Sequence, residues 1–175
     1  MRPRNIQQSG EQILLRELTV DDASQAYCDW LNDPVVNKYL ETRHATTPQL
    51  REYIQKQIDD PNSLFLGVLD KQSGQHIGNV KLEPIDWQNK KAVFGILIGE
   101  KSYWNRGVGT EATRLAVTIA FGQLGMECVE LGVISENAAA IRAYQKVGFR
   151  ETQRIPKAMN HGGILYDKVV MQIQA

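Results

Sequence analysis

The sequence predicts an α/β (α+β) fold: a mixed, mostly antiparallel twisted sheet of about seven strands flanked by about four helices. Two observations predict this fold. In residues 64–98, three apolar runs are joined by connections too short for a crossover helix, which indicates an antiparallel meander. In the second half, apolar runs alternate with segments of helical periodicity, which is typical of strands covered by helices.

Local signals define the individual elements. Thr19 to Asp22 resembles a capping box before a helix. Pro48 suits the first turn of another helix, where its missing N–H costs nothing, and Gly148 lies where a helix commonly ends. The expected strands cover 13–18, 64–69, 77–82, 92–98, 128–134 and 164–173, with Phe149 also in the sheet, and the expected helices cover 23–31, 47–58, 110–124 and 137–147.

Length and composition bound the domain organisation. The 175 residues fit one domain, and the hydrophobic fraction of 42% is that of an ordinary globular chain. Residues 1–11 are polar, and we expect a loose arm there, followed by a single domain over 12–175. With 20 basic and 20 acidic residues the net charge is zero, which argues against a nucleic-acid partner bound by bulk charge.

The cysteines and the N-terminus indicate the compartment. Cys28 and Cys128 form no CxxC pair, so we expect neither a disulfide framework nor a metal site. The N-terminus lacks the apolar stretch of a secretory signal, and no apolar run approaches the roughly 20 residues of a membrane helix. We therefore expect a cytoplasmic protein with no membrane partner.

The turn from Trp104 to Thr110 carries two glycines, Gly107 and Gly109, between a strand and a helix. The first N–H groups of a helix have no partner, and glycine lets a ligand approach them, so this turn suits a phosphate or pyrophosphate. A P-loop is disfavoured because Gly-Lys-Ser/Thr is missing, and a dinucleotide fingerprint lacks its third glycine. A tight turn that merely starts a helix remains an alternative.

A second group, Asn137 and Tyr144, follows another strand, with the two residues about two helical turns apart. Asn137 either caps its own helix or holds a ligand. Tyr144 lies on the apolar stripe of that helix. It either packs in the core or, at the edge of a pocket, donates a proton from its phenol.

Two segments resemble the signature motifs of the GNAT family of N-acetyltransferases. Residues 104–112 (WNRGVGTEA) resemble its pyrophosphate loop Q/R-x-x-G-x-G/A, and residues 137–149 (NAAAIRAYQKVGF) resemble its helix N-x-x-A-x-x-x-Y-x-K-x-G-F. The resemblance covers residues 13–173 and implies the GNAT fold. One departure is Trp104, where many members have Gln or Arg. The surrounding pattern is similar to the branch that includes ribosomal-protein N-terminal acetyltransferases.

The resemblance implies acetyl-CoA as co-substrate and no metal. Tyr144 is the implied general acid at the thioester sulfur, and the N–H of Ile98 is the expected donor to the oxyanion. The implied cofactor-binding residues are Leu97, Ile98 and Gly99 beside the pantetheine arm, Asn105, Arg106, Gly107, Val108, Gly109 and Thr110 around the pyrophosphate, and Asn137 near the pantetheine.

The general base and the acceptor pocket are less defined. Some members carry a carboxylate five residues before the motif asparagine, where this chain has Gly132. Glu130, two residues earlier on the same face, is the candidate catalytic base, and a water-mediated route is equally open. Further candidate bases are Glu41, His76, Glu83 and Asp86, and the expected substrate-binding residues are Trp30, Glu41 and Arg43, with core packing of Trp30 as the alternative.

The expected function is therefore an acetyl-CoA-dependent N-acetyltransferase that acts on a primary amine by direct attack in a ternary complex. We favour a small-molecule acceptor such as an amino sugar. An N-terminal (ribosomal) protein acetyltransferase and a non-catalytic acetyl-CoA-binding sensor remain alternatives. A homodimer through the last strands or through the apolar surface of the second half is a hypothesis by analogy with the family.

Overall fold

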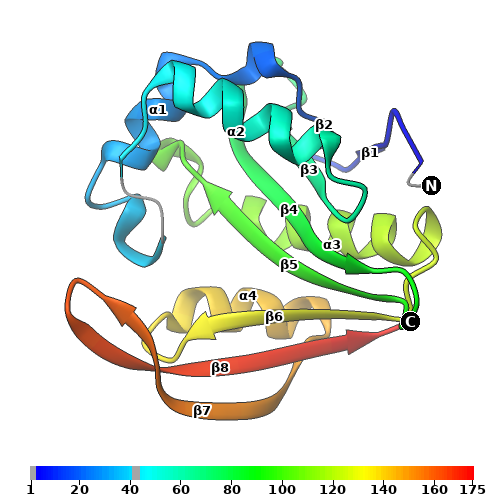
Figure 1. Cartoon of the computed structure of the whole chain (residues 1–175), viewed down its shortest axis with the longest axis vertical. Helices are drawn as coiled ribbons and strands as arrows, with labels where there is room; N and C mark the ends of the chain where they lie inside the picture. Colours follow the sequence, from blue (N-terminus) through cyan, green and yellow to red (C-terminus); the bar gives the residue numbers. More distant parts are fainter. Residues whose placement is uncertain (1–2, 41–43) are drawn as a thin grey trace.

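The computed structural model describes residues 3–40 and 44–175 as one twisted eight-stranded sheet with helices on both faces (Figure 1). The strand order is β1-β2-β3-β4-β5-β6-β8-β7, and among these neighbours β5 and β6 alone are parallel. The predicted mixed, mostly antiparallel sheet is confirmed. The strands are β1 (Gln7–Ser9), β2 (Ile13–Glu17), β3 (Leu64–Asp70), β4 (His76–Asp86), β5 (Lys91–Ile98), β6 (Cys128–Ile134), β7 (Arg150–His161) and β8 (Ile164–Gln174).

The helices form two layers. On one face, α3 (Val108–Gly122) and α4 (Ala138–Val147) pack on the larger hydrophobic core. On the other face, α1 (Gln25–Asn32) and α2 (Thr47–Asp59) pack on a smaller core, and in Figure 1 they lie over the upper half of the sheet. Within the described ranges, none of the helices is long and apolar enough to cross a membrane.

The helices end where the sequence signals predict, except that the capping box at Thr19 belongs to a different helix than expected. Thr19 and Asp22 form the expected capping box, but it caps the short 3-10 helix η1 (Val20–Asp22). The α1 helix begins after Ser24, whose hydroxyl accepts a hydrogen bond from the N–H of Tyr27. Gly148 ends α4 with φ 117°, a backbone conformation that favours glycine.

Two segments differ from expectation. The expected loose arm over 1–11 contains β1, which pairs with β2. Ile6, just before β1, is 3% exposed and belongs to the larger core, which helps to hold this segment in place. The sheet segment expected around Phe149 is a twelve-residue strand, β7. This strand lies at the sheet edge with most of its side chains exposed, so it lacks the apolar alternation by which strands are predicted.

The strands β5 and β6 separate along their length. They pair over Lys91–Val93 and Cys128–Glu130. Beyond that point β5 continues to pair with β4, and β6 continues to pair with β8. The remaining parts of β5 and β6 therefore keep a free backbone edge toward each other, and α3 begins shortly after the open end of β5.

Glu111, in the first turn of α3, ties this helix to the turn between β1 and β2. It is 9% exposed, and its carboxylate accepts hydrogen bonds from the N–H of Gln12 at 3.0 Å and from the Gln12 side chain at 3.2 Å. A methyl group at Gly10 would overlap the same carboxylate. The start of α3 is thus held from two sides, by its own turn and by β1–β2.

Replacing Glu111 tests this connection. Glu111→Ala leaves the N–H of Gln12 without its partner, and we expect the free energy of unfolding to fall by about 1–3 kcal/mol. Chemical denaturation measures the change. The exposed Glu11→Ala in the same turn is the control and should unfold like wild type; equal stability of all three proteins would contradict the connection.

Candidate active site

The glycine turn before α3 leaves open space beside the N-terminus of this helix. Gly107 is the N-cap residue with φ 77°, and Asn105 also has a positive φ of 59°. The first helical bond runs from the N–H of Glu111 to the carbonyl of Gly107, so the N–H groups of residues 108–110 precede it and have no partner within the helix. A Cβ atom at Gly107 or Gly109 would meet nothing within 4 Å. This end of α3 can therefore accept an anion at close range.

Trp104 joins this turn to the open end of β5. Its indole N–H donates a hydrogen bond of 2.8 Å to the carbonyl of Ile98. The guanidinium of Arg106 lies 6.0 Å from the centre of the Tyr103 ring, which keeps a positive charge beside the turn. The Trp residue that departs from the family motif thus has a defined structural role, fixing the turn to the strand.

The free edge of β5 offers backbone groups to a ligand. Gly99 donates its N–H to the carbonyl of Ile77 on β4. Because successive N–H groups of a strand point in opposite directions, the N–H of Ile98 points away from β4, toward β6. The side chain of Leu97 packs against the smaller core with α1 and α2. An extended ligand can therefore lie along this edge in the manner of an added strand.

Tyr144 lies on the α3/α4 side of the same strand. It is 8% exposed, and its ring centre lies 6.0 Å from those of Phe94 on β5 and Phe149. Burial raises the pKa of the phenol to about 12. Its hydroxyl makes no hydrogen bond within the described part of the chain, and so remains available to a ligand.

The side chains of Asn137 and Glu130 make hydrogen bonds within the protein. The Asn137 side-chain oxygen accepts a hydrogen bond of 3.3 Å from the N–H of Ala140 and so caps α4. Glu130 lies where β5 and β6 are still paired and accepts bonds of 2.6 Å from both Lys91 and Gln172. Burial acts to raise the pKa of Glu130, but these bonds outweigh it and the pKa is lowered. A carboxylate held in this way is a weak proton acceptor.

The expected acceptor residues have a mixed outcome. Glu41 and Arg43 lie outside the described residues. Trp30 is 6% exposed rather than at a pocket rim, because its indole packs on Gly99 and on the His76 ring, whose centre is 5.2 Å away. A methyl group at Gly99 would overlap this indole. Trp30 therefore supports the open end of β5 from the α1/α2 side of the sheet.

The other candidate bases are also occupied. His76 bonds to Asn79 at 2.7 Å, and burial lowers its pKa. Glu83 pairs with Lys81 at 2.6 Å, and Asp86 accepts hydrogen bonds from the following turn. Within residues 3–40 and 44–175, no cluster of three or more His, Cys, Asp and Glu side chains could hold a metal ion.

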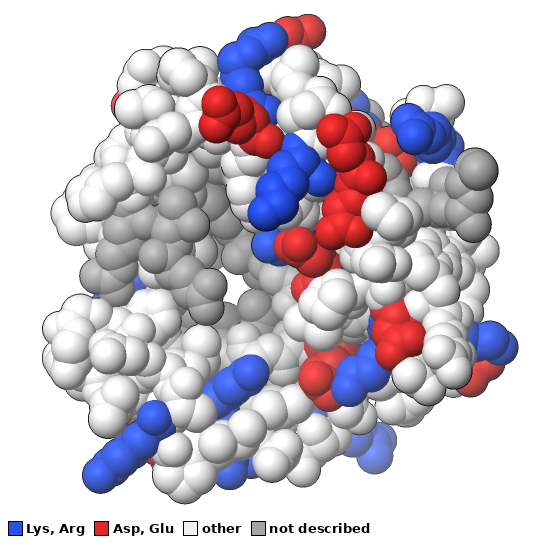
Figure 2. All heavy atoms as spheres, viewed as in Figure 1, with Lys and Arg blue, Asp and Glu red and all other residues white. Residues whose placement is uncertain are grey.

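Gly95 on β5 carries no sequence signal that marks it as part of the site. A Cβ atom there would meet nothing within 4 Å, so open space adjoins the strand at this point. Its position two residues after the last β5–β6 pair is visible only when the register of the two strands is known. Figure 2 shows a hollow on this face, between the half that carries α1 and α2 and the half formed by β6, β8 and β7.

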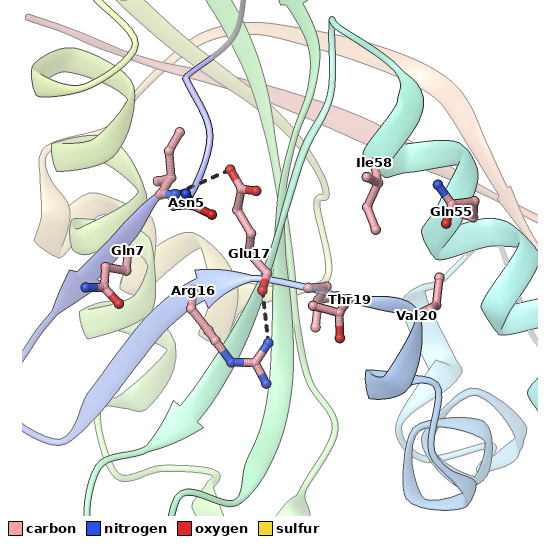
Figure 3. Close-up of a pocket in the computed structure, with 10 residues that line it drawn as sticks. Asn5, Gln7, Arg16, Glu17, Thr19, Val20, Gln55 and Ile58 are labelled. Atoms are coloured by element: carbon pink, nitrogen blue, oxygen red, sulfur yellow. Dashed lines mark hydrogen bonds between the residues drawn. The ribbon is translucent and has the colours of Figure 1, made fainter.

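A cavity of the described part of the chain lies elsewhere. It has a volume of about 440 Å³ and lies between the β1–β2 pair, the start of η1 and α2 (Figure 3). Arg16, which lines it, is held by two hydrogen bonds of 2.8 Å to Asp22. No residue of β5, β6 or α4 lines this cavity, so it is separate from the strand opening.

Comparison with known proteins identifies the family. The family model described as Acetyltransferase (GNAT) domain matches residues 12–150. The chain is 23% identical to the uncharacterised N-acetyltransferase YoaA of Bacillus subtilis (strain 168), covering 93% of both chains. It is 28% identical to spermidine N(1)-acetyltransferase of Escherichia coli (strain K12), covering 81% of this chain and 74% of that protein.

Solved structures agree with this assignment. The crystal structure of spermidine N-acetyltransferase from Vibrio cholerae in complex with CoA and spermine superposes with a TM-score of 0.86 at 25% identity. The match covers 94% of this chain and 96% of that one. With the fold, the glycine turn and the family match in agreement, the chain belongs to the GNAT acetyltransferase family and is an N-acetyltransferase.

Proposed function

We propose that the protein transfers an acetyl group from acetyl-CoA to a primary amine by direct attack in a ternary complex. One observation carries the proposal: the free edge of β5 leads directly to the open start of α3. The first suits an extended pantetheine arm, and the second suits the pyrophosphate of the same molecule. The CoA complex of the Vibrio cholerae relative supports the same donor.

The expected cofactor residues fit this donor. Leu97, Ile98 and Gly99 form the end of β5, and Asn105 to Thr110 form the turn and the first residues of α3. Arg106 adds a positive charge at the exposed side of the turn. Asn137 contributes through its amide nitrogen, because its oxygen caps α4.

The chemistry follows from these positions. The neutral amine attacks the thioester carbonyl, a C–N bond forms, and the oxyanion accepts a hydrogen bond from the N–H of Ile98. The C–S bond then breaks, and the Tyr144 phenol donates a proton to the departing thiolate sulfur of coenzyme A. The nitrogen, now part of the amide, loses its extra proton to water, and water returns a proton to the tyrosinate. Because the pKa of Tyr144 is raised to about 12, the phenol is protonated at every ordinary assay pH.

An alkylammonium must lose its proton before it attacks, since its pKa is about 10. Glu130 is tied to Lys91 and Gln172, and its lowered pKa opposes this role. We therefore place the proton's exit through water in the strand opening rather than on Glu130.

The acceptor we favour is a small amine, such as an amino sugar. The spermidine N-acetyltransferases among the relatives support an amine acceptor of this size. A protein N-terminus is the alternative acceptor, and an acetyl-CoA sensor without turnover is the alternative function. Release of free thiol from acetyl-CoA, measured over a panel of small amines and short peptides, separates the three.

We also propose a compartment and an oligomeric state for the enzyme. Both cysteines are free thiols, which supports a reducing, cytoplasmic compartment. Ile164 and Leu165, at the start of β8, are 57% and 53% exposed, which supports a homodimer through the last two strands. Sedimentation equilibrium of the wild type and of Leu165→Glu tests the dimer.

The pyrophosphate turn is tested at Gly107. We expect Gly107→Val to raise the KM for acetyl-CoA by about tenfold or more, because its side chain enters open space that the phosphates would use. Gly125→Val is a matched control at the far end of α3, with a similar φ of 67° and equally open surroundings. An equal effect of both variants on KM would contradict the assignment.

The acid is tested at Tyr144. Tyr144→Phe keeps the ring and its contacts but removes the proton donor, so kcat should fall about 100-fold with little change in KM. Tyr27→Phe removes a hydroxyl from another buried tyrosine, in the smaller core, and should keep full kcat. If Tyr144→Phe were as active as Tyr27→Phe, the phenol would serve packing alone.

Glu130→Gln separates a structural from a catalytic carboxylate. The folded pKa of Glu130 is lowered, so its contribution to stability is present above the unfolded pKa of about 4.3 and is lost as pH falls through the folded value. We expect Glu130→Gln to unfold at a lower temperature than wild type at pH 7, with the difference shrinking in acid. Its kcat should stay close to that of the exposed control Glu52→Gln; a large loss of kcat would identify Glu130 as the base.

A further inference from the structure

The face of the sheet that an acceptor would approach can be defined from side-chain alternation. Phe94, Leu131 and Val169 point into the larger core with α3 and α4. Successive residues of a strand point to opposite faces. Gly95 on β5, Gly132 on β6 and Lys168 on β8 therefore belong to the opposite face, the one that carries α1 and α2.

Two glycines border the opening on this face. The last pair of β5 and β6 joins Val93 to Glu130, and Gly95 and Gly132 each lie two residues further along their strands. Neither contributes a side chain to close the opening, and the space at Gly95 is free to at least 4 Å. An amine can therefore reach the free edge of β5 between these two residues.

Lys168 covers the Gly132 side of the opening. A Cβ atom at Gly132 would overlap Cε of Lys168 and would lie 3.3 Å from its Nζ. The ammonium group thus lies over Gly132, the position at which some family members carry a carboxylate. In residues 3–40 and 44–175, no carboxylate oxygen lies within 4.0 Å of this ammonium.

The neighbouring lysines of this face are neutralised. Lys81 pairs with Glu83, and Lys91 pairs with Glu130, each at 2.6 Å. Lys168 helps to lower the pKa of Glu130, but that carboxylate is already bonded to Lys91 and Gln172. Of these three lysines, Lys168 is therefore the one without an ion-pair partner in the described part of the chain.

A cation at this place discriminates between acceptors. It repels a substrate that carries several positive charges, since like charges at short range cost free energy. It attracts an anionic oxygen, and hydrogen bonds between an ammonium and such an oxygen are among the stronger ones in proteins.

We propose that the acceptor carries a carboxylate or phosphate close to its primary amine, and that Lys168 binds this anionic group. The inference rests on the proposed acetyltransferase function and narrows its substrate class. Polyamines such as spermidine, the substrate in the names of two relatives, are then poor acceptors for this chain.

Matched pairs of amines test the substrate class. Wild-type enzyme is assayed for thiol release with glucosamine 6-phosphate against glucosamine, with an α-amino acid against its amide, and with spermidine. We expect kcat/KM to be about 10- to 100-fold higher for the anionic member of at least one pair than for its neutral partner. Which pair shows the preference distinguishes a phosphate from a carboxylate. Equal use of both members in each pair, or a preference for spermidine, would overturn the inference.

Variants of Lys168 connect that preference to the residue. Lys168→Gln should abolish the advantage of the anionic member while the neutral member keeps its kcat/KM, and Lys168→Glu should favour spermidine. Gly132→Ala displaces the ammonium without removing it and should weaken the same preference. Lys56→Gln, on the exposed side of α2, is the control and should behave like wild type.

The two levels of the proposal fail in different ways. Binding of acetyl-CoA without turnover on any amine would overturn the acetyltransferase proposal and the inference with it. Turnover in which Lys168→Gln retains the full preference for anionic acceptors would overturn the inference alone. The variants report on binding of the acceptor, so the KM for acetyl-CoA should be unchanged in all of them.

Discussion

Parallel pairing between β5 and β6 stops after Val93 and Glu130, and the rest of the site depends on this separation. Beyond it, each strand is held by its other neighbour, β4 or β8, so the opening needs no additional support. Beyond Val93 and Glu130, the N–H and C=O groups on the facing edges of β5 and β6 have no partner on the other strand. Buried backbone groups normally need such partners. A ligand of extended shape can satisfy these groups, which is why we propose the opening as the binding site.

Local charge in this protein differs from its bulk charge. The net charge of zero gives no indication of an anion site. The start of α3 nevertheless presents N–H groups of residues 108–110 beyond the first helical bond, and a helix N-terminus carries a partial positive charge. On the proposed acceptor side, pairing neutralises Lys81 and Lys91, whereas Lys168 has no ion-pair partner among residues 3–40 and 44–175. In the proposed function, binding of donor and acceptor depends on where a few charges are left uncompensated.

The sequence predicted the sheet, the four helices and the glycine turn because each has a short-range signal. Apolar alternation, caps such as Gly148 and the glycine spacing at 107 and 109 all act within a few residues. The length of the edge strand β7 and the presence of the short strand β1 were not predicted, because polar edge strands lack that alternation. Their positions are set by pairing with β8 and β2.

The site likewise contains residues that sequence motifs predict and residues that only contacts between distant segments position. The turn at 104–110 and Tyr144 follow from motifs, and the structure places them at the two ends of the opening. Burial of Trp30 on Gly99 and the bonding of Glu130 to Lys91 depend on contacts between distant segments. Lys168 carried no sequence signal, since its position over Gly132 is fixed by the β6–β8 register.

The central claim is that the separated edge of β5 and the start of α3 form one continuous binding site for the donor. Residue-resolved amide hydrogen exchange with and without coenzyme A tests it most directly. We expect exchange to slow at Ile98 and at residues 108–110 together, while Gly99, already bonded to Ile77, changes little. Protection of the α3 amides without Ile98, or binding that leaves both unchanged, would contradict the account.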